Sequence, residues 1–486
     1  MNFDFSDIFK DKAIKLVSET AQEIGIDAFV VGGFVRDHIL GRPNKDVDVL
    51  TLGAQSSERL AMAVKSKLGK YSSMSIFKNF GTAQVKSHDV EIEFVTARKE
   101  SYNRDSRNPK CEPGNLRDDL SRRDFSLNAM CVRLCDRNDE TLDCGIGTGK
   151  KGELIDLFDG QRDLEWGILR TPLDPVVTFD DDPLRMMRCV RFASQLGMSP
   201  EENTFNAIRE NADRIKIITH ERIKDEFVKI MMSKRPSVGL YFMEESGLME
   251  QVLPDVHALA GIETKNGRAH KDNFLHTMQV LDNVSEKSDN LFLRISALFH
   301  DIAKPQAKKF EQGRGWTFHN HEYLGGKMMP RIFKHLTLPL GMELEYTKKL
   351  VSLHMRPISL IEEGVTDSAI RRLLFEAGDD IDDLMILCDA DITSNNVLKR
   401  EKFHNNYKIL REKMQEIEEK DHIRLFQPPV SGNDIMETFG IGQCREIGII
   451  KEEIKNAILD GKIHNDREEA LKMMFEIAER IGLKKV

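Results

Sequence analysis

Residues 30–49, VVGGFVRDHILGRPNKDVDV, combine a pair of glycines with a pair of aspartates. An apolar, β-branched run over residues 26–31 predicts a strand that stops at Gly32-Gly33, and residues 34–40 predict a short helix directly after it. A helix that opens on such a turn presents backbone N–H groups that can bind a polyphosphate. Because a glycine pair is far more often a tight turn alone, a second feature is needed to support a binding site.

The aspartates supply that feature. Asp46 follows the second glycine by thirteen residues, and Asp48 lies two positions further, on a predicted strand over residues 47–50. Alternate strand residues face the same side, so both carboxylates point at one spot. Adjacent carboxylates repel unless a cation neutralises them, and Mg²⁺ prefers oxygen ligands together with substrate phosphates. Two such ions can activate a hydroxyl nucleophile and stabilise a leaving pyrophosphate. The spacing favours this catalytic interpretation over a solvated strand edge. Glu93, on a predicted strand over 90–95, is a candidate third carboxylate or equally an exposed side chain.

The composition indicates a soluble globular protein. The 486 residues are 40% apolar and 31% charged, and ~150 residues per domain suggests about three domains. The longest apolar runs fall far short of the ~18 residues of a membrane helix, and the N-terminal residues do not predict a secretory signal. Seven scattered cysteines fit free thiols, and a net charge of −9 still allows a local basic face for nucleic acid. We therefore expect a cytoplasmic protein with no membrane partner.

Strand signals concentrate in the first third of the chain. Residues 99–117 are polar and predict a long loop, and loops of that length are usually functional or mobile. After about residue 175 helical patterns dominate, and Asp182-Pro183 is typical of a helix start. The pattern predicts an α+β head followed by a long helical body.

Five ordered segments between residues 30 and 230 resemble one family. The Gly32-Gly33 and Asp46-x-Asp48 pattern resembles the head of the polymerase β-type nucleotidyltransferases. RRDFSLNA at 122–129 resembles the RRDFTINA segment of tRNA nucleotidyltransferases and bacterial poly(A) polymerases. The other segments resemble the linker, helix and neck motifs of that family: DLFDGQRDL at 156–164, DDPLRMMR at 181–188 and THERI at 219–223. Together they resemble the class II CCA-adding enzymes.

This resemblance implies an α+β fold class: a polymerase β-type head of mixed sheet and helices, followed by an all-helical neck, body and tail. The implied domains are a nucleotidyltransferase head, a nucleotide- and RNA-binding neck, a body and a tRNA-binding tail, at 1–150, 151–255, 256–400 and 401–486. The implied reaction is template-independent addition of CCA to the tRNA 3′ end, in which CMP and AMP are transferred from CTP and ATP with release of pyrophosphate. Asp46 and Asp48 would hold the catalytic Mg²⁺.

The resemblance also assigns residues to the nucleotide site. Arg123 offers a cation to phosphate and Asp124 an acceptor to a ribose hydroxyl, with Asn128 one helical turn beyond Asp124. Asp182 and Arg185, spaced i, i+3 on one helix, would present an acceptor beside a forked donor to the base edge, and so select CTP and then ATP without a nucleic-acid template. An ion pair on a helix is the simple alternative for each pair. The remaining residues assigned to nucleotide binding are Gly32, Gly33, Arg36 and Arg188.

Some positions depart from the family pattern without removing a charged group: Asp181 replaces Glu, Ser126-Leu127 replaces Thr-Ile, and Leu157-Phe158 replaces Pro-Phe. The polar segment 98–117 keeps the Arg-x-Glu-x-Tyr start of the family at Arg98, Glu100 and Tyr102. In this family an intact loop accompanies the switch from C to A addition, and enzymes that add only CC lack it. Full CCA addition is therefore expected.

Histidines concentrate in the body, where seven of the fourteen fall between His270 and His354. Their order, H…HD…H…H…D, resembles the HD phosphohydrolase superfamily, with the members His276, His300, Asp301, His321, His354 and Asp391. Imidazoles and carboxylates can bind one or two cations, here a transition metal (Ni, Zn, Fe, Co or Mn), and metal-bound water could attack a phosphate ester. His319 is the alternative to His321, and a body that serves only as scaffold and RNA surface is the alternative to catalysis.

Two alternatives to CCA addition remain. A poly(A) polymerase shares all five segments and would lengthen RNA with ATP alone. A phosphohydrolase whose head only binds RNA would use the histidine cluster for its chemistry. The tail from 427 to 465 resembles the tRNA-gripping tail of the family, with simple helical packing as the alternative.

Overall fold

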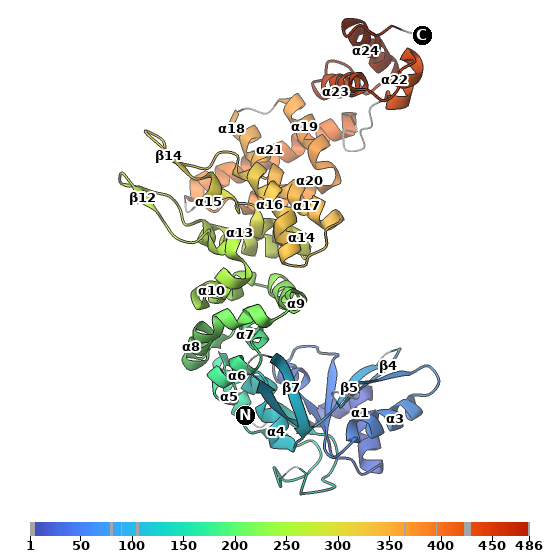
Figure 1. Cartoon of the computed structure of the whole chain (residues 1–486), viewed down its shortest axis with the longest axis vertical. Helices are drawn as coiled ribbons and strands as arrows, with labels where there is room; N and C mark the ends of the chain where they lie inside the picture. Colours follow the sequence, from blue (N-terminus) through green and yellow to red (C-terminus); the bar gives the residue numbers. More distant parts are fainter. Residues whose placement is uncertain are drawn as a thin grey trace. The chain divides into compact units, whose positions relative to one another are not determined.

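The computed structural model describes residues 5–77, 81–88, 90–103, 106–142, 144–363, 366–394, 396–421 and 429–484. The chain divides into two compact units (Figure 1). Unit 1 comprises Met1–Ser233 and Val238–Leu253, and unit 2 comprises Lys234–Ser237 and Pro254–Val486. Of the tail segment 427–465, residues 427 and 428 lie outside the described residues.

Unit 1 begins with a mixed seven-stranded sheet, as the sequence predicts. The strand order is β3-β4-β5-β2-β1-β8-β9. β1 is antiparallel to β2 and β8, whereas β2 is parallel to β5. The strands are β1 Ala28–Val31, β2 Val47–Thr51, β3 Ser73–Phe77, β4 Thr82–Ser87, β5 Val90–Thr96, β8 Met130–Arg133 and β9 Leu154–Asp156.

Helices cover the sheet and bury its central strands. α1 (Lys12–Glu23) and α3 (Ser56–Leu68) pack against it, and α4 (Leu116–Ser121) contributes Leu116 and Leu120 to a core with Phe29 and Leu50. β1 is buried along its whole length, which explains its uninterrupted apolar sequence. The short helix α2 (Gly33–Ile39) follows β1 directly, at the predicted position.

The prediction of a long loop over residues 99–117 is wrong. The segment forms an antiparallel hairpin, β6 (Arg98–Asn103) and β7 (Ser106–Pro113), and then enters α4, where Asn115 and Asp118 make a capping box. Side chains such as Lys99, Ser101 and Lys110 are exposed. A two-stranded ribbon that is solvated in this way lacks the apolar alternation by which strands are recognised in a sequence.

The remainder of unit 1 is mostly helical. A two-residue strand pair, β10 (Ile168–Leu169) and β11 (Ser199–Pro200), lies among its helices. The helices are α5 Gly160–Trp166, α6 Pro175–Asp181, α7 Leu184–Leu196, α8 Glu202–Asn211, α9 His220–Met231, α10 Pro236–Ser246, whose first two residues belong to unit 2, and α11 Leu248–Val252. α7 begins just after the predicted start at Asp182-Pro183.

Unit 2 is helical, with two short hairpins that the sequence interpretation missed. The hairpins are β12 (Thr264–Lys265) with β13 (Arg268–Ala269), and β14 (Lys309–Glu311) with β15 (Gly315–Thr317). Asn266-Gly267 joins the first pair with positive φ angles of 52° and 73°, and Asn-Gly between short strands was an available hairpin signal. The helices are α12 Pro254–His257, α13 Asn273–Ser285, α14 Leu291–Phe299, α15 Lys304–Ala307, α16 His321–His335, α17 Met342–Leu353, α18 Met355–Glu363, α19 Asp367–Ala377, α20 Ile381–Ala390, α21 Val397–Asp421, α22 Gly432–Phe439, α23 Arg445–Leu459 and α24 Arg467–Arg480.

None of the helices among the described residues combines the length and the apolar character needed to cross a membrane.

A buried ion pair in unit 1 connects the end of β8 with the residue before β1. Arg133 Nη1 lies 3.3 Å from Asp27 Oδ1, with side-chain exposures of 0% and 1%, and the guanidinium carbon lies 4.6 Å from the centre of the Phe29 ring. The Asp27 carboxylate also accepts hydrogen bonds from the backbone N–H groups of Asn138 and Asp139. The pair therefore fixes the segment after β8 against the start of β1.

Asp27→Ala is expected to lower the free energy of unfolding of unit 1 by about 3–5 kcal/mol, because it removes the carboxylate that faces a buried guanidinium and that accepts two backbone N–H groups. Urea denaturation of the full chain measures the loss. The matched control is Glu23→Ala, which removes the partially exposed pair with Lys67 and should cost less than about 1 kcal/mol. A loss for Asp27→Ala as small as that of the control would contradict the structural role of the pair.

Candidate functional site

The glycine turn requires glycine at its first position. Gly32 has φ 72° and ψ −128°, and a Cβ atom there would lie 3.0 Å from Arg123 Nη1. The N–H of Gly32 donates to Met130 O across the turn. The turn therefore brings the start of α2 against Arg123, a residue 91 positions later in the sequence. A Cβ atom added at Gly33 would meet only ordinary van der Waals contacts, so this position does not require glycine.

The paired aspartates lie beside a third carboxylate. Asp48 on β2 and Glu93 on β5 are direct neighbours in the register of the parallel strands, and Asp46 precedes β2 with its N–H bonded to Asn44 Oδ1 at 2.9 Å. Burial raises the pKa of the Asp48 carboxyl and Asp46 raises it further, although Arg123 lowers it. Burial and Asp48 likewise raise the pKa of Glu93. Carboxylates that destabilise one another's charge suit a hard divalent cation. Among the described residues, however, the oxygens of these three do not form a group within 4.8 Å of one another.

The segment 122–129 forms the next part of the site, but not as a helix. The expectation that Asn128 lies one helical turn beyond Asp124 is wrong, because α4 ends at Ser121 and only residues 126–128 form a 3₁₀ turn. The two side chains nevertheless meet, with Asn128 Nδ2 donating to Asp124 Oδ1 at 3.0 Å. Arg36 Nη1 of α2 donates to Asn128 Oδ1 at 2.8 Å, so the glycine-turn helix is tied to this segment.

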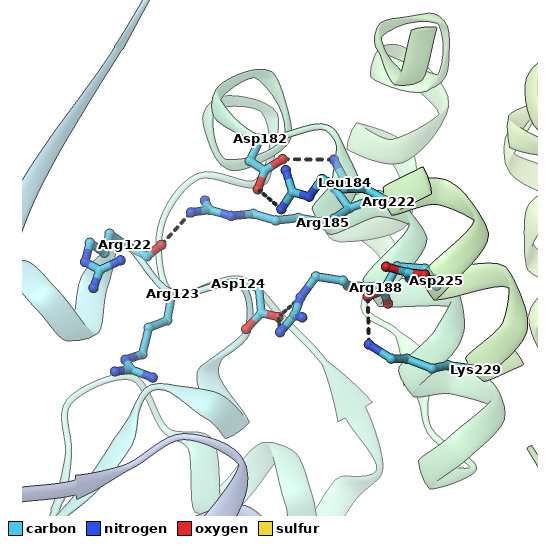
Figure 2. Close-up of a pocket in the computed structure, with 11 residues that line it drawn as sticks. Arg122, Arg123, Asp124, Asp182, Leu184, Arg185, Arg188, Arg222, Asp225 and Lys229 are labelled. Carbon is cyan, nitrogen blue, oxygen red and sulfur yellow. Dashed lines mark hydrogen bonds and ion pairs between the residues drawn. The ribbon is translucent and has the colours of Figure 1, made fainter. Parts of the chain in front are cut away.

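Asp124 is held in its ionised form by an arginine of α7. Arg188 Nε and Nη2 lie 2.7 and 2.6 Å from Asp124 Oδ2 (Figure 2). Burial alone would raise the pKa of the carboxyl, but Arg188 and Asn128 lower the pKa of Asp124 to about 2. The salt bridge is thus intact at any pH at which the protein would work, and it fixes the segment 122–129 against α7.

Asp182 and Arg185 line a polar cavity of about 350 Å³ within unit 1. The expectation that the two residues share one helix is wrong. Asp182 precedes α7 and its carboxylate accepts a hydrogen bond from the Leu184 N–H at 3.2 Å, whereas Arg185 lies in the first turn of α7. The Arg185 guanidinium donates to Arg122 O at 2.7 Å and to Thr178 O at 3.3 Å. Two backbone carbonyls therefore orient this buried side chain, and its other N–H donors remain for a ligand.

The cavity combines six cationic and four acidic side chains. Besides the predicted Arg123, Asp124, Asp182, Arg185 and Arg188, its lining includes Arg122, Leu184, Arg222, Asp225, Glu226 and Lys229. The last four of these belong to α9. The sequence had indicated only Arg222, as part of the THERI segment, and not the other three. Their spacing of three and four residues places charged groups on one helical face, which was the signal available.

The hairpin β6–β7 is connected to this cavity through Arg122. Arg122 Nη1 lies 3.0 Å from Glu100 Oε1, and Arg98 Nε donates to the same oxygen at 2.7 Å. Asp119, which the sequence analysis did not single out, is fully buried and pairs with both Arg122 and Arg123. Because the Arg122 carbonyl also binds Arg185, the hairpin, the arginine pair and the cavity form one connected network.

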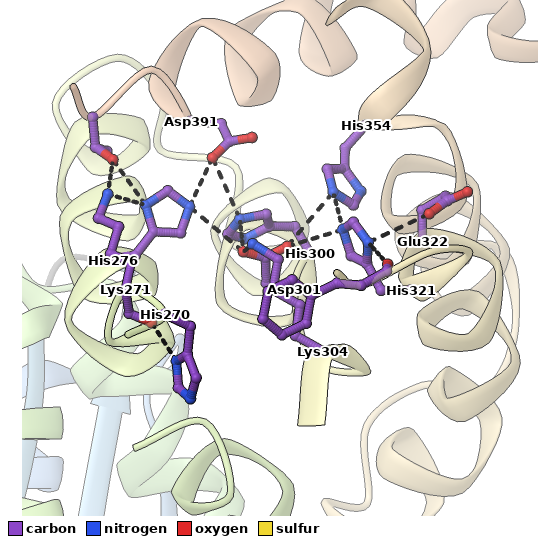
Figure 3. Close-up of polar contacts among 12 residues, drawn as sticks. His270, Lys271, His276, His300, Asp301, Lys304, His321, Glu322, His354 and Asp391 are labelled. Atoms are coloured by element: carbon purple, nitrogen blue, oxygen red, sulfur yellow. Dashed lines mark hydrogen bonds and ion pairs between the residues drawn. The ribbon is translucent and has the colours of Figure 1, made fainter. Parts of the chain in front are cut away.

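All six predicted members of the histidine cluster come together in unit 2, from five helices and their ends (Figure 3). Two groups of three have their nearest ligand atoms within 4.8 Å of one another: His276 with His300 and Asp391, and Asp301 with His321 and His354. Asp301 connects the groups, with one oxygen 3.2 Å from His300 Nε2 and the other 3.1 Å from His321 Nε2. Among the residues that the structure describes, these are the two groups of histidine, cysteine, aspartate or glutamate side chains whose ligand atoms lie this close together.

Backbone carbonyls orient three of the imidazoles. The Nδ1 atoms of His300, His321 and His354 lie 2.7–2.8 Å from carbonyl oxygens three residues earlier in the chain. Each contact directs Nε2 toward the centre of the cluster, which is the arrangement that supports metal-ligating histidines. His319 is exposed and lies near Glu311, so the structure brings His321 rather than His319 into the cluster.

The cluster fits a cation on two further observations. His300 Nε2 is buried and, among the described residues, has no hydrogen-bond partner of good geometry, although two carboxylates face it. Burial lowers the pKa of His300, but Asp301 and Asp391 outweigh it and raise the pKa to about 10. Burial and His300 lower the pKa of His354 to about 3. Imidazoles and carboxylates that face one another in this way are the donor types that a transition-metal cation binds.

Family models match three parts of the chain. The poly(A) polymerase head domain matches residues 28–170, a probable RNA- and SrmB-binding site of polymerase A matches 197–259, and the HD domain matches 273–396. The fold also resembles solved structures: the Thermotoga maritima CCA-adding enzyme complexed with tRNA-CCA has a TM-score of 0.59 at 18% identity, and the match covers 99% of this chain and 100% of that one.

Curated relatives carry three different names. The CCA-adding enzyme of Ligilactobacillus salivarius is 39% identical over 48% of this chain and 52% of its own length, so the match spans about half of that relative. The A-adding tRNA nucleotidyltransferase of Deinococcus radiodurans is 26% identical over 91% and 93% of the two chains. The CC-adding tRNA nucleotidyltransferase of Halalkalibacterium halodurans is 30% identical over 62% of this chain and 72% of its own. The chain therefore belongs to the tRNA nucleotidyltransferase family with a poly(A) polymerase-type head, and it has an HD domain.

Proposed function

We propose that this protein adds CMP and then AMP, from CTP and ATP, to the 3′ end of tRNA. The observation that carries the proposal is the cluster of Asp46, Asp48 and Glu93 in the same unit as the cavity lined by Asp182 and Arg185. The first group suits phosphoryl chemistry and the second suits recognition of a base. Family membership supports the reaction class.

In this proposal Asp46 and Asp48 hold divalent cations, most simply Mg²⁺, which would activate the RNA hydroxyl and neutralise the triphosphate. Arg123 supplies a fixed positive charge beside Asp48 for the phosphates. Asp124 is already committed to Arg188 and Asn128, so its role in the site is to position them and to offer its remaining acceptor capacity to a ribose hydroxyl.

Asp182 and Arg185 would present an acceptor and a donor to the base edge in the cavity. Because the Arg185 guanidinium is already oriented by the carbonyls of Arg122 and Thr178, little side-chain entropy is lost when a base binds. The Arg185 guanidinium can recognise first cytosine and then adenine only if the residues around it shift slightly between the addition of C and the addition of A. The connection from Glu100 of the hairpin through Arg122 to Arg185 supports a role of the hairpin in that shift.

The test uses three tRNAs, ending before the CCA, after the first C and after CC, each incubated with CTP, ATP or both. The proposal expects two C additions followed by one A, and no A on the first two substrates without CTP. The named relatives make the alternatives concrete, since one adds A and another adds CC. Addition of A only to the CC-ending tRNA would indicate an A-adding enzyme, and long A tails without CTP a poly(A) polymerase. Either result would contradict CCA addition.

Arg185→Ala is expected to reduce discrimination against UTP and GTP by about one to two decades, since an unpaired buried polar group costs ~1–3 kcal/mol. The measurement is kcat/KM for each of the four nucleotides. The ratio is informative because a general loss of stability lowers all four together. Arg209→Ala, an exposed arginine of α8 outside the cavity, is the matched control. Equal losses for all four nucleotides would contradict base recognition by Arg185.

We also propose that the histidine cluster binds one or two transition-metal ions and hydrolyses phosphoesters. The donor set of four imidazoles and two carboxylates supports a transition metal over Mg²⁺. When bound, the metal would supply an activated water. Asp301 would bridge the two groups, and Lys304, whose Nζ lies 2.5 Å from Asp301 Oδ2, would balance its charge. A scaffold without catalysis remains the competing function for this domain.

A further inference from the structure

The two hairpins of unit 2 carry a group of aromatic rings at the border of the histidine cluster. The hairpins contact one another through β13 and β15. The ring centre of Trp316 lies 5.2 Å from that of Phe310 and 5.7 Å from that of His270, and His270 also lies 6.2 Å from Phe318. All four rings are partly exposed. We call this surface the hairpin platform; it comprises Lys265, His270, Lys308, Phe310, Trp316 and Phe318.

Lysines alternate with these rings. Lys308 Nζ lies 5.2 Å from the centre of the Trp316 ring, and Lys265 Nζ lies 5.3 Å from that of Phe310. A third lysine, Lys304, lies 5.7 Å from the Phe318 ring. Aromatic faces interleaved with cations are the combination that binds unpaired nucleotides, because bases stack on rings while lysines attract the phosphates.

The local charge supports the same partner. Residues 258–272 and 303–318 contain seven lysines and arginines but three acidic residues, although the whole chain has a net charge of −9. A basic surface on an acidic protein indicates a specific attraction for anions. Lys308 pairs with Glu263 at 2.5 Å, so an incoming anion competes with one carboxylate there. An acidic peptide would compete in the same way, but it would leave the four neighbouring rings without a stacking partner.

A small cavity lies at the base of the platform. Its volume is about 240 Å³, and its lining includes His270, Asn273, Pro305 and Lys308. Small-ligand sites usually begin at about 300 Å³. The cavity is therefore smaller than a usual ligand site and would hold at most part of a nucleotide, such as a base or a phosphate.

The platform is continuous with the histidine cluster along two paths. Lys271, next to His270, has its Nζ 2.7 Å from Thr393 Oγ1, which in turn lies 2.8 Å from His276 Nδ1 (Figure 3). On the other path, Lys304 reaches from the Phe318 ring to Asp301, and the Phe318 carbonyl orients His321. A nucleotide chain on the platform would thus place a phosphate beside the candidate metal ligands.

We propose that the hairpin platform binds unpaired nucleotides and directs one of their phosphoesters to the histidine cluster, which makes single-stranded nucleic acid the substrate class of this site. The inference rests on the proposed phosphohydrolase function for its catalytic consequence, but not for binding. It adds a binding surface, outside the metal ligands, that distinguishes nucleotide esters from other phosphate esters.

Trp316 provides a local reporter, because the chain has two tryptophans and the other, Trp166, lies in unit 1. In the full chain carrying Trp166→Phe, titration with a single-stranded hexa-adenylate RNA should quench the remaining tryptophan fluorescence. The quenching should saturate, and binding should weaken as salt is raised. Inorganic phosphate and a duplex of the same length, whose bases are already stacked, should quench little. Absence of saturable quenching by the single strand would overturn the proposal.

Lys265→Ala combined with Lys308→Ala, in the same background, should weaken binding at least fivefold and flatten its salt dependence. Lys265 is exposed on β12, and Lys308 lies between α15 and β14, where its Nζ pairs with the exposed Glu263 at 2.5 Å. The melting temperature of the double variant, compared with that of the parent, separates a loss of binding from a loss of folding. Lys334→Ala, an exposed lysine of α16 elsewhere in unit 2, is the matched control and should bind as the parent does. Equal weakening by the control would overturn the assignment to the platform.

Hydrolysis separates the two proposals. With the metal-loaded full chain, Trp316→Leu should raise KM at least fivefold for the p-nitrophenyl ester of thymidine monophosphate and leave KM for bis(p-nitrophenyl) phosphate unchanged, whereas Trp316→Phe should retain most of the affinity. Quenching without hydrolysis of either ester would support the platform and remove the phosphohydrolase function. Hydrolysis of both esters with no effect of Trp316→Leu on either KM would overturn the platform and leave the phosphohydrolase standing.

Discussion

Replacing Asp48 with alanine is expected to abolish the incorporation of CMP and AMP alike. Asp48 is opposite Glu93 in the register of β2 and β5, and Asp46 and Arg123 both shift the pKa of its carboxyl. Metal stabilisation of transition-state charge amounts to several kcal/mol, and about 1.4 kcal/mol corresponds to one decade. We therefore expect a loss of roughly three decades or more in kcat/KM for both nucleotides, measured on a tRNA lacking CCA.

The structure predicts that this loss will not come from unfolding. Burial raises the pKa of Asp48, which means that its charge at neutral pH destabilises the cation-free fold, so removing the charge should preserve or increase the melting temperature. Glu91→Gln is the matched control, because Glu91 is an exposed carboxylate of the same strand paired with Lys86. Retention of nucleotide addition in Asp48→Ala would exclude the two-cation mechanism and favour a head that only binds RNA.

The double variant His300→Ala/Asp301→Ala should lose bound transition metal and any phosphohydrolase activity while nucleotide addition persists. Asp301 connects both ligand groups and His300 contributes to one of them, so the pair affects every possible metal position in the cluster. The head chemistry belongs to unit 1 and the cluster to unit 2, and sites with no shared partner behave nearly additively. Elemental analysis of the purified chains gives the metal content directly.

The matched control for the double variant is His319→Ala, which removes an exposed histidine two residues from His321 and outside the cluster. It should retain the metal content of the parent chain. Equal metal in the double variant and the parent would mean that the histidines are structural. Loss of nucleotide addition as well would show that the two units depend on one another.

Local periodicity made several parts of the site predictable. The Asp-x-Asp spacing next to an apolar run indicated the pairing of Asp46 with Asp48, because alternate strand residues share a face. In the structure Asp46 lies just before β2 and Asp48 lies on it. The strands β1, β2 and β5 and the start of α7 follow from apolar runs and from an Asp-Pro pair, which act over a few residues. The ordered histidines and aspartates likewise identified a candidate metal site before the helices that carry them were known.

The remaining features depend on contacts between distant parts of the chain. The parallel register of β2 and β5 places Glu93 beside Asp48, and strand register is not encoded locally. Asn128 meets Arg36 across 92 residues, and Arg185 is oriented by the carbonyls of Arg122 and Thr178 rather than by Asp182. The polar hairpin after Arg98 has no apolar alternation, so only its pairing reveals it.

The choice between His319 and His321 shows the same division. Both histidines occur in one short segment. The neighbours Glu322 and Gly325 fit the family pattern better with His321 as the ligand, but they leave the choice open. α16 begins at His321, and its backbone directs that side chain inward while His319 stays in solvent. Local patterns along the chain were enough to identify the residue types that could form each site. Which of those residues meet depends on packing, because burial and hydrogen bonds between distant segments fix the direction of each side chain.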